Sequence, residues 1–241
     1  MDRNSNTYTF IFAIIMVIVV GTALAYTATS LAPLQSKNVL QEKMQNILAT
    51  IGIESDREGA PAKYEKYIEK ALVLNNKGEV KEGMDAFSVD LAKELDKPVE
   101  EQSFPLYIAN VDGKKFYIIP LRGAGLWDAI WGYVSLKEDI NTIAGATFDH
   151  KGETPGLGAE ITKPYFSQKF TNEKIFDADG NLVGVSVVKG YTDAGNKDDN
   201  KVDSISGATI TSVGVSNMIS ERLKHYLAYF KKQGNFNAVN Q

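Results

Sequence analysis

An uncharged apolar stretch near the N-terminus limits how this chain can fold. Residues 8–26 read YTFIFAIIMVIVVGTALAY, and no charged residue occurs between Arg3 and Lys37. At 1.5 Å per residue in an α-helix, this stretch can cross about 28 Å, close to the thickness of the hydrocarbon core of a bilayer. The tyrosines at both ends suit the two membrane interfaces. The sequence therefore predicts one N-terminal transmembrane anchor within residues 1–30.

A cleaved signal peptide is the competing interpretation of this stretch. Signal peptides have a shorter apolar region, a more basic start and small residues at the cleavage site. Ala23-Leu-Ala25 and Ala28-Thr-Ser30 loosely match such a site, but the length of the stretch and its weakly basic start favour an anchor. Positive charges are nearly balanced on its two sides, so the residues alone leave the orientation of the anchor open.

Beyond the anchor, the spacing of apolar residues predicts one α+β domain on a helical stalk. Residues 38–51, 60–74 and 85–95 show the spacing of amphipathic helices. Residues 31–98 are therefore predicted as the stalk and the helical part of the domain.

Residues 99–241 are predicted to hold the antiparallel strands of the domain. Two β-rich runs flank Asp112-Gly113, a strong signal for a hairpin turn. The last predicted element is a helix with apolar residues on one face. The predicted strands and this helix cover residues 105–111, 115–121, 132–136, 142–150, a second hairpin over 174–188, and 212–232.

The composition narrows the chemistry of this domain. The chain has no cysteine, which excludes disulfides, cysteine-ligated iron–sulfur clusters, thiolate nucleophiles and c-type haem attachment. With only His150 and His225, a histidine-built metal site is not expected, and no metal site is predicted. The net charge is -4 and no block of Lys and Arg occurs, which argues against a nucleic-acid partner. Any redox chemistry must therefore use an organic cofactor.

Residues 203–211, DSISGATIT, form the first segment that suits a bound cofactor. Its small residues let the backbone approach a bulky ligand closely. A hydroxyl at the start of the following helix would face free amide donors and the positive end of the helix dipole, which favour a phosphate. The alternative is an ordinary helix cap, because Ser and Thr are good N-cap residues.

Residues 150–158, HKGETPGLG, form the second such segment. A stretch rich in Gly and Pro after a strand is usually a turn. It would also allow close approach to a flat ring, with Leu157 as the apolar contact and Glu153 and Thr154 as polar partners. The segment lacks the third glycine of a dinucleotide fingerprint, and the chain has no Walker A sequence, so direct binding of NAD(P)H or ATP is unsupported.

Together these two segments resemble the hallmarks of the FMN-binding domain family. In that family a flavin transferase joins FMN through a phosphoester to the last threonine of Ser-Gly-Ala-Thr, which here is Thr209. Glu-Thr-Pro-Gly-Leu-Gly is the second hallmark, and the family places it at the flavin. The resemblance thus implies covalent FMN on Thr209 and a flavin site that also includes Asp203, Ser206, Gly207, Ala208, Glu153, Thr154, Leu157 and Gly158.

Two further residues are candidates for the flavin site. Trp131, with the nearby Trp127 as the alternative, would stack near the isoalloxazine ring, although an aromatic residue in a strand-flanking run is more often part of the core. Lys189 ends the run 182–188 and would reach the phosphate or the ring edge, although a solvated strand end is the simpler interpretation.

The resemblance extends beyond the flavin hallmarks. Residues 123–133, 141–143, 148–150 and 225–230 are similar to the corresponding parts of the C subunits of sodium-translocating NADH:quinone oxidoreductases. The G subunits of Rnf electron-transport complexes share the flavin hallmarks and are the alternative, but the tryptophan-rich segment favours the C subunits.

The resemblance implies an electron-relay subunit with no catalytic residue of its own beyond the flavin. NADH and quinone would react on other membrane subunits of the complex, and a flavin transferase would load the FMN. The domain would lie on the periplasmic side of the bacterial inner membrane, anchored in the lipid. A stand-alone membrane-anchored flavin reductase is the rival, but it would need a substrate site, and the sequence shows no cluster of Arg and His.

Overall fold

The computed structural model describes residue 3, residues 5–192 and residues 195–233, and the chain divides into two units between Glu42 and Lys43. The first unit consists mainly of helix α1 (Asn6–Ala49), whose last turns belong to the second unit. By length and composition α1 can cross a membrane, and none of its most apolar window is buried, so it is not a core helix. The predicted spanning stretch is therefore one part of a longer continuous helix.

The second unit is built on a five-stranded antiparallel sheet in the order β1-β2-β3-β4-β5. Asp112 and Gly113 have φ angles of 51° and 82°, which produce the tight two-residue hairpin predicted between β2 and β3. The predicted strands of the sheet are confirmed. The strands are β1 (Ile68–Leu74), β2 (Phe104–Val111), β3 (Lys114–Ala124), β4 (Ala129–Leu136) and β5 (Ile143–His150).

The helix predicted over residues 60–74 is wrong in its second half. Helix α2 (Ala60–Tyr67) is followed directly by the edge strand β1, which pairs with β2. Leu74 packs into the core on one face of the sheet and Val73 into the core on the other. The run Ile68–Leu74 does not alternate between apolar and polar residues, so its pairing with β2, and not its own pattern, makes it a strand.

The helix predicted over residues 85–95 is interrupted. It consists of a 3-10 turn, η1 (Ala86–Ser88), and a short helix, α3 (Leu91–Leu95). The Asp90 side chain accepts a hydrogen bond from the Ala92 amide at 3.0 Å, so a new helix begins there.

The second predicted hairpin is present only at its turn. Phe176 and Leu182 form an isolated antiparallel bridge, but the Ile175 carbonyl accepts hydrogen bonds from the amides of both Val183 and Gly184. Because two successive amides share one carbonyl, the regular pairing of the two strands stops there. Strand β6 (Ser186–Val188) then pairs in parallel with β7 (Lys201–Asp203), a pairing that the sequence did not indicate. The segment between β5 and this pair holds η2 (Gly158–Thr162), α4 (Pro164–Ser167) and η3 (Gln168–Phe170).

The C-terminal helix predicted over residues 212–232 consists of two helices, α5 (Thr209–Lys224) and α6 (Leu227–Lys232). The break falls at Tyr226, whose side chain is fully buried and whose hydroxyl donates a hydrogen bond to the Pro105 carbonyl at 2.8 Å. Helix α5 begins earlier than predicted, at Thr209 itself.

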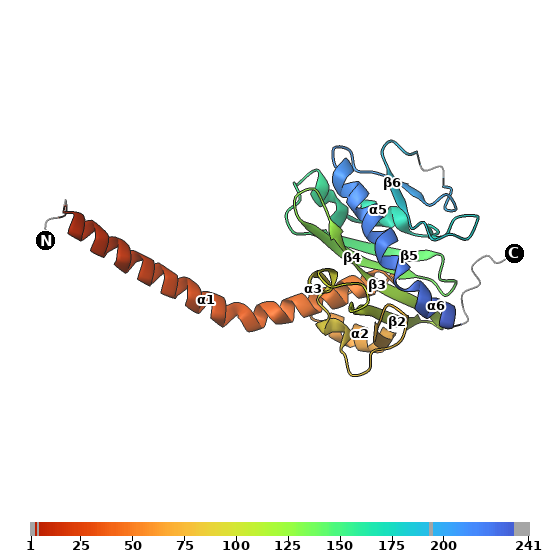
Figure 1. Cartoon of the computed structure of the whole chain (residues 1–241), viewed down its shortest axis with the longest axis horizontal. Helices are drawn as coiled ribbons and strands as arrows, with labels where there is room; N and C mark the ends of the chain where they lie inside the picture. Colours follow the sequence, from red (N-terminus) through yellow and green to blue (C-terminus); the bar gives the residue numbers. More distant parts are fainter. Residues whose placement is uncertain (1–2, 4, 193–194, 234–241) are drawn as a thin grey trace. The chain divides into compact units, whose positions relative to one another are not determined.

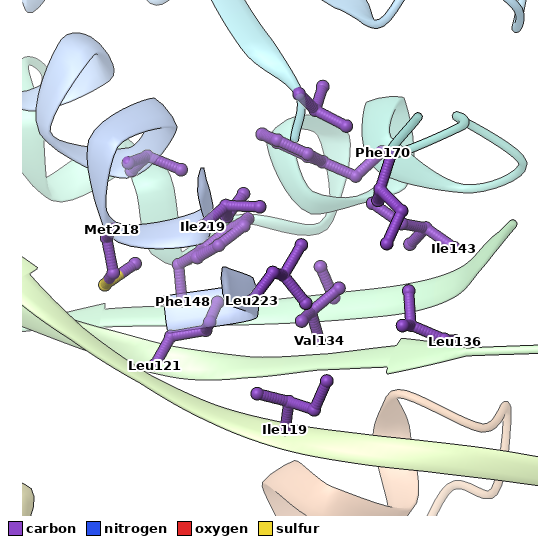
Figure 2. Close-up of a cluster of buried hydrophobic side chains, with 14 of the residues drawn as sticks. Ile119, Leu121, Val134, Leu136, Ile143, Phe148, Phe170, Met218, Ile219 and Leu223 are labelled. Atoms are coloured by element: carbon purple, nitrogen blue, oxygen red, sulfur yellow. The ribbon is translucent and has the colours of Figure 1, made fainter. Parts of the chain in front are cut away.

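Two hydrophobic cores cover the two faces of the sheet. Helix α5 lies on one face and contacts β3 and β4 (Figure 1). Figure 2 shows its Met218, Ile219 and Leu223 packed above strand residues such as Leu121 and Val134. On the opposite face, the buried Ile47 and Leu48 from the end of α1 belong to a second core, with residues of η1 and the sheet. Burial of both faces explains why β2 and β3 are apolar without strict alternation.

Candidate flavin site

A cavity of about 260 Å³ lies where the start of α5 meets two loops of the sheet. The loops are the turn between β3 and β4 and the segment that follows β5, and the residue after β6 completes the wall. The lining residues are Leu126, Glu153, Thr154, Leu157, Gly158, Lys189, Gly207, Ala208, Thr209, Ile210 and Thr211. The two segments singled out in the sequence therefore face each other across one cavity.

Most of the predicted site residues line this cavity, and three of them do not. Trp131 is partly buried in β4, paired with Arg122 on one side and Asp149 on the other. Asp203 ends β7, with its Oδ2 atom 3.6 Å from Lys169 Nζ. Ser206 is exposed to solvent outside the lining set.

Leu126, Ile210 and Thr211 line the cavity but were not predicted as site residues. Ile210 and Thr211 lie within the first segment, residues 203–211, and Leu126 lies within residues 123–133, one of the further stretches of resemblance. Membership of these stretches was the available signal. Leu126, Leu157 and Ile210 are 48%, 41% and 59% exposed, so the cavity has an apolar rim open to solvent.

The start of α5 places Thr209 at the mouth of the cavity. Thr209 is the first residue of the helix and is exposed, while the preceding Ala208 is buried. The N–H groups of the first helical turn have no carbonyl one turn back to pair with, so they and the helix dipole favour an anion here. The chain reaches this position through Gly207 at φ 78°, where an added Cβ would lie 2.7 Å from the Leu157 side chain.

Glu153 lies on the inner wall, and both oxygens of its carboxylate accept hydrogen bonds from the protein. Its Oε2 atom accepts a hydrogen bond from the Thr211 hydroxyl at 2.6 Å, and its Oε1 atom accepts one from the Trp127 amide at 3.0 Å. The side chain is buried, which by itself would raise its pKa. Hydrogen bonds from Thr211 and from the amides of Trp127 and Leu126, with a contribution from His150, outweigh that effect and lower the pKa of Glu153 below its ordinary value. The group is therefore an anion at neutral pH.

Neither histidine lines the cavity. His150 Nδ1 accepts a hydrogen bond from the Glu153 amide at 3.1 Å, and the His225 ring stacks on Phe104 at a centroid distance of 4.7 Å. Within the described part of the chain, no group of three or more His, Cys, Asp or Glu side chains could hold a metal ion.

The cavity suits a ligand with a flat apolar part and an anionic end. Leu126, Leu157 and Ile210 offer apolar contacts, whereas the first turn of α5 and Lys189 offer positive electrostatic potential. Thr209 adds an exposed hydroxyl at the anionic end. A flavin nucleotide has these two parts, so the residues present fit FMN.

Comparison with known proteins decides which family this is. Residues 125–224 match the FMN-binding domain family, and this range contains every residue that lines the cavity. The C subunit of the Na+-translocating NADH-quinone reductase from Pseudomonas aeruginosa is 32% identical over 239 residues, which cover 90% of this chain and 91% of that protein. The chain belongs to the family of these C subunits. The predicted resemblance is thereby confirmed.

Other C subunits agree with this assignment. The Neisseria meningitidis serogroup A protein is 34% identical over 231 residues, covering 89% of this chain and 88% of that protein. The crystal structure of the C subunit from Parabacteroides distasonis is 44% identical, covers 83% of this chain and 96% of that chain, and superposes with a TM-score of 0.75. Shewanella oneidensis NqrC, at 24% identity and a TM-score of 0.71, has the same fold and covers 80% of this chain and 97% of that chain.

Proposed function

We propose that this chain is the electron-transfer C subunit of a Na+-translocating NADH-quinone reductase and carries FMN covalently on Thr209. The observation that carries the proposal is the position of Thr209. It is an exposed hydroxyl at the first residue of a helix, on the wall of a cavity that lies wholly within the FMN-binding domain match.

The proposed link is a phosphoester between Thr209 Oγ1 and the phosphorus of the flavin phosphate. Thr209 gives up its hydroxyl proton and the phosphate gives up one hydroxyl group, and together these leave formally as water, so attachment needs no oxidant or reductant. The amides of the first turn of α5 and the Lys189 ammonium would neutralise the phosphate charge. A flavin transferase would perform the attachment, and the exposed Ser206 and partly exposed Asp203 beside the site suit recognition by that enzyme.

Bound FMN supplies reversible electron transfer, and the protein supplies its position and surroundings. Among the residues lining the cavity, only Glu153 and Lys189 carry a charge. The Glu153 carboxylate already accepts hydrogen bonds from the protein, so it is not positioned as a general base. The proposed chain is thus a relay, with NADH and quinone reacting on other subunits.

Membrane attachment is the remaining part of the proposal. Helix α1 would hold the chain in the bacterial inner membrane beside its partner subunits, with the domain on the periplasmic side. The exposed apolar surface of α1 supports contact with lipid.

The relay can be separated from the rival, a stand-alone flavin reductase, by a reduction experiment. The flavin of the isolated loaded chain should be reduced by dithionite but not by NADH at a useful rate. In the assembled complex, NADH should reduce the same flavin. Rapid bleaching by NADH in the isolated chain would support the reductase and overturn the relay.

A further inference from the structure

Three walls of the cavity meet at a single carboxylate. Glu153 belongs to the loop after β5, its Oε2 atom is 2.6 Å from the Thr211 hydroxyl in α5, and its Oε1 atom is 3.0 Å from the Trp127 amide between β3 and β4. Thr211 and Glu153 are 1% and 5% exposed, so water does not compete for these hydrogen bonds.

Glycines on two of these walls make room for the carboxylate. A Cβ added at Gly125 would lie 2.4 Å from Glu153 Oε1, and one added at Gly158 would lie 2.1 Å from Glu153 Oε2. A Cβ at Gly158 would also lie 2.7 Å from Thr211 Oγ1. The close approach of all three segments therefore depends on the space around this one side chain.

We propose that Glu153 is the positioning residue of the cavity. Its carboxylate joins the turn at residues 125–128, the loop at residues 152–158 and the first turn of α5. The arrangement of Leu126 and Leu157 relative to the Thr209 hydroxyl depends on that junction. The proposal rests on the proposed function only for the identity of the ligand, a flavin whose ring lies between walls that Glu153 holds in place.

The proposal differs from a purely local role for Thr211. If the hydroxyl of Thr211 only stabilised the start of α5, its removal would loosen α5 alone. If Glu153 joins the walls, removing the hydroxyl also loosens residues 125–128, to which Thr211 is linked through Glu153.

Hydrogen exchange on the flavin-free full-length chain tests the junction directly. Thr211→Val removes the donor at similar volume, and Thr211→Ser keeps a hydroxyl. Thr50→Val is the matched control: Thr50 is also 1% exposed, and its hydroxyl donates a hydrogen bond to the Ile47 carbonyl at 2.7 Å at the end of α1.

Thr211→Val should speed exchange of the amides of residues 125–128 by about tenfold or more, because local opening there becomes easier. Thr211→Ser and Thr50→Val should leave these amides close to wild type. Unchanged exchange at residues 125–128 in Thr211→Val, or an equal change in Thr50→Val, overturns the proposal. If Thr211→Val does not fold, Glu153→Gln is measured in its place, with the same expectation.

Circular dichroism in the flavin absorption bands tests the consequence for the ligand. In the loaded chain, Thr211→Val should lose part of the signal while the mass of bound flavin stays unchanged, and Thr211→Ser should restore it. An unaltered spectrum in Thr211→Val contradicts a role in positioning the ring. If the wild-type chain carries no flavin by mass, the proposed function fails, while hydrogen exchange still decides whether Glu153 joins the walls.

Discussion

Two glycines of one loop should respond in opposite ways to the same substitution. In Gly158→Ala the new methyl group would fall 2.1 Å from Glu153 Oε2, a distance that real side chains do not tolerate. In Gly152→Ala the methyl group would meet nothing within 4 Å. Neither residue has a positive φ angle, so the contrast between them arises from the space around the methyl group.

The expected change in the free energy of unfolding follows from the contacts that the new methyl group would disrupt. Overpacking a filled site costs about 1–3 kcal/mol, and losing a hydrogen bond to a charged group costs about 1.5–3 kcal/mol. Gly158→Ala should therefore lower the free energy of unfolding by about 3–5 kcal/mol. Gly152→Ala should raise it by about 0.4–1 kcal/mol, because alanine restricts the unfolded chain.

Urea unfolding of the full-length chain in detergent, followed by far-ultraviolet circular dichroism, measures both effects. The midpoint should fall in Gly158→Ala and stay or rise in Gly152→Ala, with similar dependence on urea concentration in both. Equal midpoints in the two variants would show that the Glu153 site relaxes without cost. That result would refute the close-packed junction.

Three other predictions concern the same chain. Because the folded pKa of Glu153 is lowered, the stability it contributes is present above its ordinary pKa of 4.5 and is lost as the pH falls through the folded value. The difference in urea midpoint between wild type and Thr211→Val should accordingly shrink below that pH, and a constant difference down to strong acid would contradict the pKa argument. Thr147→Val should retain full flavin content by mass, since the Thr147 hydroxyl oxygen is buried and has no hydrogen-bond partner within the described residues. N-terminal sequencing of the chain from its native membrane should begin at or near Met1, whereas a start near Ala25 or Ser30 would mean a cleaved signal.

The strands of the sheet could be predicted where neighbouring residues alone indicate them. The turn Asp112-Gly113 and the β-rich runs around it identify β2 and β3 from neighbouring residues alone. Strand β1 was missed because its partner β2 lies far along the chain, beyond η1 and α3. The break between α5 and α6 was missed for the same reason, since it depends on the Tyr226 hydroxyl reaching Pro105 in β2.

The site residues also fall into those predictable from neighbouring residues and those that depend on distant parts of the chain. The two hallmark segments are local motifs, so Thr209, Leu157 and most of the lining could be predicted. The role of Glu153 could not, because its partner Thr211 lies 58 residues away in the sequence and is brought near only by the packing of α5. A sequence motif identified Glu153 as a site residue. Only the structure shows that its carboxylate accepts hydrogen bonds from Thr211 and the Trp127 amide.

Peptide mapping of the native chain shows directly whether FMN is bonded to Thr209. The chain contains a decoy, Ala144-Gly145-Ala146-Thr147, which repeats the Gly-Ala-Thr core inside strand β5. The peptide with Thr209 should carry the mass of FMN less one water, the peptide with Thr147 should carry none, and Thr209→Val should abolish the modification. Covalent flavin that persists in Thr209→Val, or flavin found on the Thr147 peptide, would contradict the assignment.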